Sequence, residues 1–295
     1  MRVSQQLLME STYRDLNRAA ERLLRLQNQV SSGRRVLNAS DDPVSTHRIL
    51  EMRGELSRID PAQRKSQYVV SWLSLTESSL GRMEDIIARA KELAISQSSA
   101  TATAQTRQST GQEVKQLFDE ILMIANTRMG DRYVFGGTQT LRAPVSRDEQ
   151  YRVTFHGNQE GIEVGVGNQR TVRMNVSAVE ALERSGLLDT MRGLIEGLEG
   201  NDPEAIRSAL NGLDRGHEAI LALHSEVGAR VKAVESNTAD LGELRLDLES
   251  ILSQYQDADM ARVITDLLNQ QTVYEAALRT TAMITRLNLM EFLPM

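Results

Sequence analysis

The sequence predicts a mainly α-helical protein with a small β module, built as an elongated helical-bundle or coiled-coil rod. Three observations predict this fold class. Apolar residues recur every seven positions over long stretches, the period changes to two in one central segment only, and aromatic residues make up only 4% of the 295 residues. Compact domains usually rely on large aromatic side chains for part of their core. Here Leu, Ile, Val, Met and Ala must fill it, as in helix-on-helix packing.

A long amphipathic helix is predicted near the N-terminus, from Val3 to Ser31. Leu16, Leu23 and Val30 recur every seven residues, and Leu26 lies three residues after Leu23 on the same face of the helix. We expect the helix to end at Ser32 and Gly33, because glycine can supply a left-handed C-terminal turn.

Further helices follow a polar connection. Asp42 before Pro43 is typical of an N-cap with proline at the first helical position. Asp60-Pro61 predicts a break or a restart, and Ser96–Thr110 is so poor in apolar residues that we expect a loop. Between these two interruptions, a heptad series is formed by Leu73, Leu80 and Ile87.

The period changes to two in the middle of the chain. The alternating segments are Tyr151–Phe155, Ile162–Val164 and Val172–Val176, and glycine-containing turns separate them. This pattern predicts a β module of three to five strands.

The most regular heptad pattern follows a helix start at Asp202-Pro203. Its members are Ile206, Leu213, Ile220, Val227, Val234, Leu241, Leu248 and Tyr255. Asn237 and Thr238 interrupt the second apolar stripe that accompanies this series. The phase of the seven-residue repeat shifts near Asp257–Asp259, which predicts a hinge or a domain boundary. Residues 204–290, if nearly continuous helix, would extend about 130 Å, which predicts a rod.

Composition excludes several classes of protein. Without cysteine there are no disulfides, Cys-ligated zinc sites, iron–sulfur centres or thiol nucleophiles. A net charge of −6 does not favour nucleic acid, and we expect no membrane insertion because no apolar run reaches about 18 residues. The N-terminus has no apolar core or cleavage site of a secretory signal. We therefore expect a protein that stays in the cytosol or leaves without a cleaved leader.

The two ends of the chain differ in charge. Residues 1–35 carry a net charge of +4, and residues 213–295 carry −6. Complementary charge suits two terminal helices that pair, although independently solvated faces explain the charges equally well.

No group of residues indicates catalysis. His217 and His224 lie seven positions apart, which separates them by about 10 Å along a helix and favours polar coiled-coil positions over metal ligands. Asp41-Asp42 and the Asp257/Asp259 pair are better explained as helix caps than as paired catalytic acids. The sequence therefore predicts no enzyme, no cofactor and no metal site.

Two terminal segments carry a family resemblance. Val30–Pro43 resembles the N-terminal signature of flagellin-like proteins, in which a Ser-Ser/Thr-Gly turn leads to paired aspartates. Asp257–Ala261, followed by Leu267, Gln271 and Ala276, resembles the matching C-terminal helix. Within this superfamily, Asp42-Pro43 and Gly130–Gly137 shift the resemblance toward the hook-associated protein type three family.

The resemblance implies an axial structural protein of the bacterial flagellum that joins hook to filament and gives flagellin a template. Family members leave through the flagellar type III export channel without a cleaved leader, so an extracellular location is implied. The implied partners are other copies of the chain in a ring, the adjacent hook-associated protein, flagellin, and an export chaperone on the C-terminal helix.

We expect three domains and a pair of terminal helices that forms only on assembly. The domains are residues 1–42 with 256–295 for a terminal coiled-coil assembly domain, 43–137 with 177–255 for a helical rod domain, and 138–176 for an outer β domain. The expected assembly residues are Leu16, Leu23, Leu26 and Val30 of the N-terminal helix, Ser32, Gly33, Asn38, Asp41, Asp42 and Pro43 of a connector, and Asp257, Asp259, Ala261, Leu267, Gln271, Tyr274, Ala276 and Leu278 of the C-terminal helix.

Two alternatives stay open. A flagellin, which polymerises into the filament itself, would share the terminal motifs. A cytosolic coiled-coil signalling protein would explain the heptads but not the paired terminal motifs.

Overall fold

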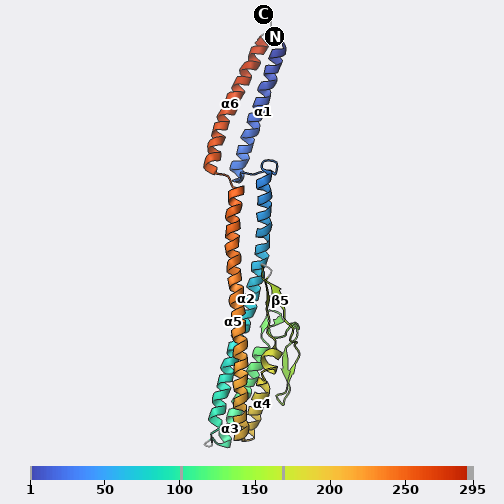
Figure 1. Ribbon diagram of the computed structural model, residues 1–295, viewed down its shortest axis with the longest axis vertical. Coiled ribbons are helices and arrows are strands. Elements are labelled where there is room, and N and C mark those ends of the chain that lie inside the picture. Colours follow the sequence, from blue (N-terminus) through green and yellow to red (C-terminus); the bar gives the residue numbers. More distant parts are fainter. Residues whose placement is uncertain (1, 100–101, 168–169, 291–295) are drawn as a thin grey trace. The chain divides into compact units, whose positions relative to one another are not determined.

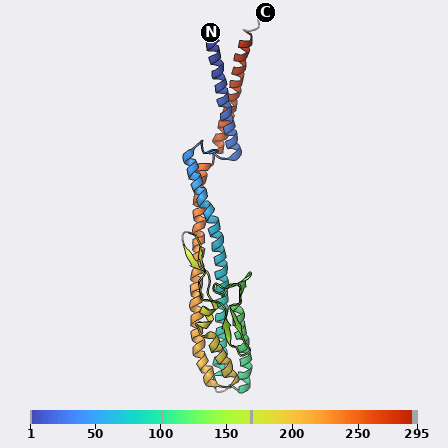
Figure 2. The same ribbon diagram turned by 90° about the vertical axis from the view of Figure 1, so that its right-hand side faces the viewer.

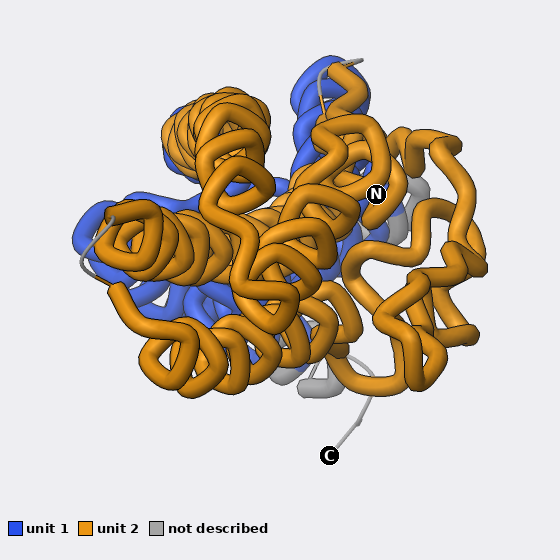
Figure 3. Tube along the Cα trace, turned by 90° about the horizontal axis from the view of Figure 1, so that it is seen from below, with its two compact units in different colours: residues 1–58, 244–295 blue, residues 59–243 orange. Residues whose placement is uncertain are grey.

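The computed structural model describes residues 2–99, 102–167 and 170–290. In this part of the chain, six α-helices, six short strands and one five-residue π-helix confirm the mainly helical fold with a small β module. The chain divides into two compact units, residues 1–58 with 244–295 and residues 59–243, which Figure 3 colours separately. We call them the terminal unit and the bundle unit. Residue 1 and residues 291–295 of the expected terminal domain lie outside the described residues.

The helices have the following bounds. They are α1 (Arg2–Ser32), α2 (Pro43–Gln97), α3 (Ala104–Ala125), α4 (Leu187–Glu199), α5 (Pro203–Gln256) and α6 (Met260–Met290), with the π-helix η1 (Val179–Glu183) before α4.

In the terminal unit, α1 and α6 lie side by side (Figures 1 and 2) and pack against each other. Ala19 is buried, and the Gln270 side-chain amide donates a hydrogen bond of 3.2 Å to its carbonyl oxygen. The predicted pairing of N- and C-terminal helices is confirmed. The expectation that they pair only on assembly was wrong, because the apolar stripes of the two helices already meet within one chain.

Local signals at the ends of α1 and α2 are confirmed. Gly33 has a φ of 68°, and its amide donates to the carbonyl oxygen of Gln29 at 2.9 Å. The chain then re-enters a helix at Pro43, where the Asp42 carboxylate accepts the amide hydrogen of Ser45 at 3.0 Å. Glycine is favoured at the first site because other residues rarely adopt a positive φ.

The predicted break at Asp60-Pro61 was wrong, because α2 continues through Pro61. Proline inside a helix removes one main-chain hydrogen bond and costs about 3 kcal/mol. Pro61 itself is exposed, whereas Ile59, Val69 and Trp72 are buried. Burial of the apolar side of α2 therefore outweighs the local preference for a break.

The predicted loop at Ser96–Thr110 was wrong over much of its length. α2 runs to Gln97, and α3 begins at Ala104 behind a capping box formed by Thr103 and Thr106. Arg107 is buried and supports the turn, since its guanidinium donates to the carbonyl oxygen of Gln97 at 3.0 Å. Polar residues here terminate and restart helices instead of forming a long loop.

The bundle unit packs α2, α3, α4 and α5 around one apolar core, with α2 and α5 antiparallel (Figures 1 and 2). Lys91 pairs with Asp214, and Glu84 lies 2.9 Å from Nδ1 of His224. The largest fully buried side chains include Trp72, Phe118, Phe135, Leu73, Leu80, Met83 and Ile87.

The heptad series of α5 is confirmed, since its members from Ile206 to Leu248 are buried and Tyr255 is half-buried. The interruption at Asn237 has a tertiary cause. Its buried side-chain amide donates to the carbonyl oxygen of Val166 at 2.6 Å, and Ser66 Oγ donates to the same oxygen at 3.3 Å. Two polar side chains in an apolar seam thus fasten a β hairpin to α2 and α5.

The β module consists of three antiparallel hairpins of two strands each. They pair β1 (Arg128–Met129) with β2 (Arg132–Tyr133), β3 (Val145–Arg147) with β4 (Val153–Phe155), and β5 (Glu163–Gly165) with β6 (Thr171–Arg173). Four of these strands, β3 to β6, lie within the predicted β domain (138–176) and match the predicted three to five, whereas the hairpin of β1 and β2 precedes it. Each strand has only two or three residues, which is too short for alternation to reveal every one.

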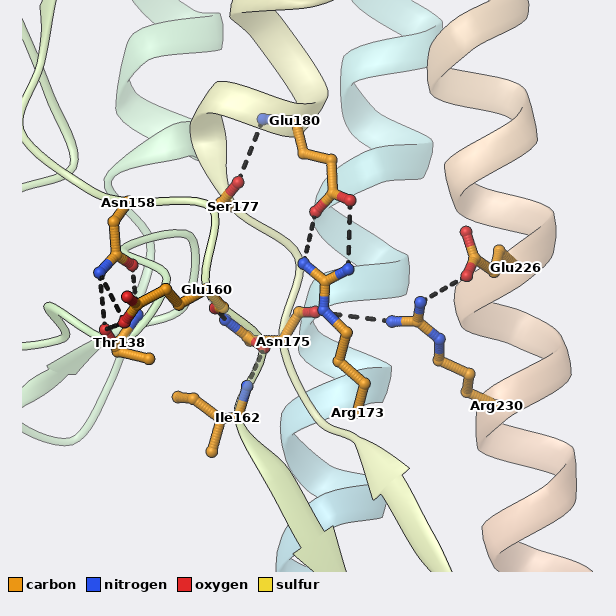
Figure 4. Close-up of polar contacts among 10 residues, drawn as sticks. All are labelled: Thr138, Asn158, Glu160, Ile162, Arg173, Asn175, Ser177, Glu180, Glu226 and Arg230. Atoms are coloured by element: carbon orange, nitrogen blue, oxygen red, sulfur yellow. Dashed lines mark hydrogen bonds and ion pairs between the residues drawn. The ribbon is translucent and has the colours of Figure 1, made fainter.

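Polar contacts hold the β module on the residues that lead into η1 (Figure 4). The Arg173 guanidinium pairs with both carboxylate oxygens of Glu180, at 3.2 and 2.7 Å. The Asn175 side chain accepts from the amide of Ile162 at 2.7 Å and donates to the carbonyl oxygen of Glu160 at 3.0 Å. These contacts orient hairpins whose strands are too short to be stable alone.

The Gly130–Gly137 segment ends in close contact with Asn158, in the loop that follows β4. Phe135 is fully buried, and its carbonyl oxygen accepts a hydrogen bond of 2.8 Å from the amide of Ala178. Gly137 has a φ of 66°, and a Cβ atom there would lie 2.2 Å from the carbonyl oxygen of Asn158. Only glycine therefore fits this position.

Candidate assembly surface and its connector

Two chain connections of the terminal unit, residues 33–42 between α1 and α2 and residues 257–259 between α5 and α6, are joined to each other. The Arg35 amide donates to the carbonyl oxygen of Gln256 at 2.8 Å, and the Ala258 amide donates to that of Gly33 at 2.9 Å. Between them, Arg34 and Asp257 form an antiparallel bridge. We call the two joined connections the clasp. It brings together segments more than 200 positions apart in the sequence.

The Arg35 guanidinium lies at the centre of the clasp. It donates to Asp42 Oδ2 at 3.2 Å, to Ser45 Oγ at 3.0 Å and to the carbonyl oxygen of Tyr255 at 3.0 Å. Its own carbonyl oxygen accepts a hydrogen bond of 2.9 Å from the Gln29 side chain. Sequence reasoning missed Arg35, because no local spacing can reveal a partner 220 positions away. The one available signal was its place between the Ser-Gly turn and the paired aspartates.

Asp42 caps α2 and is held ionised. Its Oδ2 accepts a short hydrogen bond of 2.6 Å from Ser45 Oγ, and its Oδ1 accepts the Ser45 amide. These two bonds, together with the Arg35 guanidinium, lower the pKa of Asp42 from 3.8 to about 2. The carboxylate therefore remains a hydrogen-bond acceptor over the whole physiological pH range.

The other predicted connector residues make hydrogen bonds before and after Arg35 in the chain. Ser32 Oγ donates to the carbonyl oxygen of Asn28 at 2.7 Å. Asp41 Oδ2 accepts the amide of Asn38 at 3.0 Å, and the Asp41 amide donates to the carbonyl oxygen of Asn38. Ser32 therefore bonds back to the last turns of α1, and the Asn38–Asp41 bonds close the turn that leads into Pro43.

The two aspartates between α5 and α6 have different roles, and only Asp259 caps α6. Asp259 accepts the amide of Arg262 on Oδ1 at 3.2 Å and that of Val263 on its carbonyl oxygen at 2.9 Å. Asp257 Oδ2 accepts a hydrogen bond of 2.7 Å from Ser253 Oγ. The predicted cap is therefore confirmed for Asp259, whereas the Asp257 carboxylate binds a neighbouring side chain instead of a backbone amide.

Beyond the clasp, the α1–α6 pair is only partly covered. The predicted residues Leu16, Leu23, Leu26 and Val30 of α1, and Leu267, Gln271 and Tyr274 of α6, are half-buried. The predicted residues Asp257, Asp259, Ala261, Ala276 and Leu278 are exposed. Further large apolar side chains of the pair lie in solvent. They are Leu7, Tyr13 and Leu24 of α1 and Met260, Ile264, Leu268, Val273 and Met283 of α6. Apolar surface gathered on one element is typical of an interaction site.

The described residues do not gather three or more His, Asp or Glu side chains into a possible metal site. His224 makes a polar contact with Glu84 between α5 and α2, in keeping with its predicted coiled-coil position. In the same described ranges, none of the helices combines the length and the apolar character needed to cross a bilayer.

Comparison with known proteins places these features in a family. Residues 3–140 match the bacterial flagellin N-terminal helical region. The chain is 23% identical over 306 residues to flagellar hook-associated protein 3 of Salmonella typhimurium, covering 95% of this chain and 96% of that protein. It is 24% identical over 254 residues to the flagellar filament 30.7 kDa core protein of Treponema maltophilum, with 86% and 85% covered. A putative flagellar hook-associated protein from Vibrio parahaemolyticus has the same fold, with a TM-score of 0.68 at 22% identity over 74% of this chain and 100% of that one.

Paired terminal helices, a helical bundle and the flagellin-type N-terminal region together define a class. The chain is similar to structural proteins of the bacterial flagellum in the flagellin-like superfamily. Within that superfamily it is a relative of flagellar hook-associated protein 3, and the two match over nearly their whole lengths.

Proposed function

We propose that the chain is a structural adaptor that joins hook to filament and gives flagellin a template for assembly. The observation that carries the proposal is the match to hook-associated protein 3 over 95% of this chain. The incompletely covered α1–α6 pair supports it, because an axial protein completes its core with its neighbours. Full burial of one large aliphatic or aromatic side chain contributes about 1.5–3 kcal/mol, so several such side chains on each copy favour assembly.

In this proposal the terminal coiled-coil domain, residues 1–42 with 256–295, is the assembly domain. The half-buried residues of α1 and α6 hold the pair together, and the exposed stripe, including Ala261, Ala276 and Leu278, meets neighbouring copies, the adjacent hook-associated protein and flagellin. The helical rod domain (43–137 with 177–255) supports this contact, and the β domain (138–176) projects outward. The protein acts without cofactor or catalytic residue.

We further propose that the protein reaches the extracellular flagellum through the type III export channel without a cleaved leader. A cytosolic chaperone would hold α6 before export. The exposed Ile264, Leu268 and Val273 are the surface such a chaperone would cover, since they would otherwise promote premature association.

The test is to delete the gene in the source bacterium and image the ends of the hooks. We expect hooks without filaments and flagellin shed into the medium, with both defects reversed by the unaltered gene. A labelled copy should appear at the hook–filament boundary. Normal filaments in the deletion strain would contradict the proposal.

A pair of variants tests the assembly surface itself. Leu268→Asp places a charge on the exposed stripe of α6, and we expect it to be made but not to restore filaments. Leu141→Asp is the matched control, because Leu141 is an exposed leucine that belongs to the β module of the other unit. Equal restoration by the two variants would exclude this face of α6 from the assembly surface.

The second candidate is a flagellin, favoured by the similarity to the Treponema filament protein. Purified flagellin propagates into long filaments after seeding. We expect this chain to stop after capping the seeds, and long filaments made of it alone would reverse the assignment.

A further inference from the structure

We infer that Arg35 is a positioning residue that fastens the α1–α2 connection to the α5–α6 connection, so that the start of α6 and the end of α1 are held or released as one element. The inference goes beyond the proposed function, because it concerns which side chain makes the two ends of the chain act together.

Arg35 makes hydrogen bonds to three helices. Through its guanidinium, its amide and its carbonyl oxygen, this one residue bonds to α1 at Gln29, to α2 at Ser45 and to α5 at Tyr255 and Gln256. A planar guanidinium suits this role, since its donors diverge in a fixed plane and can serve several acceptors at once.

Without the Arg35 side chain, the clasp is held by few bonds. The main-chain link consists of two hydrogen bonds, from Arg35 to Gln256 and from Ala258 to Gly33. The side chains of Arg34, Arg35 and Asp257 are exposed, so water competes at the edges of this link. The charge-assisted bonds of Arg35 therefore contribute much of what keeps the two connections together.

The Arg35 guanidinium is itself held in place by Ser45 and Asp42. Ser45 is buried, with 7% of its surface exposed, and its hydroxyl donates to Asp42 while it accepts from Arg35. Since Ser45 and Asp42 fix each other, the guanidinium binds a preformed acceptor pair. The same arrangement ties it to the first turn of α2.

Arg34 provides a matched control within the chain. It has the same charge and is also exposed, and only its backbone takes part in the bridge to Asp257. Among the residues that the structure describes, the Arg34 side chain makes no hydrogen bond or ion pair. Replacement of Arg34 therefore reproduces the loss of charge without the loss of the bonds that Arg35 makes.

The experiment is amide hydrogen exchange on the purified full-length chain and on its Arg35→Ala, Arg35→Lys and Arg34→Ala variants. The reporters are the amides of Gly33 and Ala258, neither of which bonds directly to the Arg35 side chain. We expect exchange at both amides to rise about tenfold in Arg35→Ala and by less in Arg35→Lys, whose ammonium keeps the charge but not the planar fork. Arg34→Ala should leave them within about twofold of the unaltered protein.

Two results would overturn the inference. One is an equal rise in Arg34→Ala and Arg35→Ala, which would assign the effect to charge alone. The other is a rise confined to Ser45 and the first turn of α2, since a local contact would move those amides without moving Ala258. Amides of the buried Trp72 and Leu80 region serve as the check on global unfolding, and Arg35→Lys replaces Arg35→Ala if these also become unprotected.

Filament restoration in the deletion strain separates this inference from the proposed function. If the unaltered gene restores filaments and Arg35→Ala does not, both stand. If the unaltered gene fails to restore filaments, the proposed function fails, while the exchange data on the purified chain still decide the role of Arg35.

Discussion

The α1–α6 pair and the four-helix core of the bundle unit both contain apolar residues that recur every seven positions, but the two regions bury these residues to different extents. In the bundle unit, Trp72, Leu80, Phe118 and many other side chains are fully buried. Among the described side chains of α1 and α6, Ala19 is the one buried residue, and most of the apolar positions are half-buried or exposed. Two helices can cover only one face of each other, whereas four helices enclose a core. The bundle is therefore complete within one chain, and the terminal pair is not.

Aromatic residues follow the same division. Trp72, Phe118 and Phe135 belong to the core of the bundle unit, whereas the described parts of α1 and α6 contain one aromatic residue each, Tyr13 and Tyr274. The two regions therefore differ in how far their aromatic side chains are buried, since Tyr13 is exposed and Tyr274 is half-buried.

The largest effect we expect is in the bundle core. Leu80→Ala removes a fully buried side chain and should lower the free energy of unfolding by about 2–5 kcal/mol, because it leaves a cavity in a closed core. Denaturant unfolding followed by Trp72 fluorescence measures it, since the single tryptophan reports on the bundle alone. Leu24→Ala is the control, with 58% of its side chain exposed on α1. An equal shift from both variants would remove the contrast between the regions.

A second effect tests whether close packing extends into the β module. Gly137→Ala should cost about 2–4 kcal/mol, from the left-handed backbone and from the overlap with the carbonyl oxygen of Asn158. Gly130→Ala has a similar φ of 60° but meets nothing within 4 Å, so it should cost only about 1 kcal/mol. Thermal unfolding of the two variants isolates the packing contribution. Equal losses of stability in the two variants would show that the backbone around Gly137 shifts to make room for the added Cβ atom.

A third, smaller effect concerns the terminal pair itself. Leu267→Ala removes a half-buried side chain of α6, and we expect a loss of about 1 kcal/mol, seen as about fivefold faster amide exchange along α6. Leu268→Ala, next to it and 59% exposed, should have little effect on the isolated chain. The Trp72 transition should not move in either variant. A shift of that transition by Leu267→Ala would mean that the two regions unfold together.

The smallest effect is the pH dependence of the clasp. Because the pKa of Asp42 is lowered from 3.8 to about 2, its contribution is complete above about pH 4 and is lost as the pH falls toward 2. Ser45→Ala removes the hydroxyl that contributes most to the lowering and should move the Asp42 pKa back toward 3.8. Titration of the Asp42 carboxyl carbon by NMR measures this, with Arg34→Ala as the control. An unchanged pKa in Ser45→Ala would assign the lowering to another group.

Local sequence signals predicted many element boundaries correctly. Gly33, Asp42-Pro43 and Asp202-Pro203 mark helix ends and starts where the structure has them, since capping involves residues only a few positions apart. The phase shift near Asp257 marks the interval between α5 and α6. The division into three domains and the roles of the individual assembly residues stay predictions.

Predictions failed where distant packing outweighed a local preference. Pro61 remains inside α2 because the apolar side of that helix is buried. The strands of the β module are fixed less by their own alternation than by contacts such as that of Asn237, which comes from α5.

Sequence patterns were enough to predict the helical class, the central change of period, most helix caps and the family resemblance of the two ends, because periodicity and short motifs depend on neighbours along the chain. Only the tertiary structure decided that Arg35 lies at the centre of the clasp and that Asn237 serves a hairpin. It also decided that one heptad series closes a core while another leaves apolar surface in solvent. These outcomes depend on which segments meet in space, and the relevant partners lie 220 and 71 positions away.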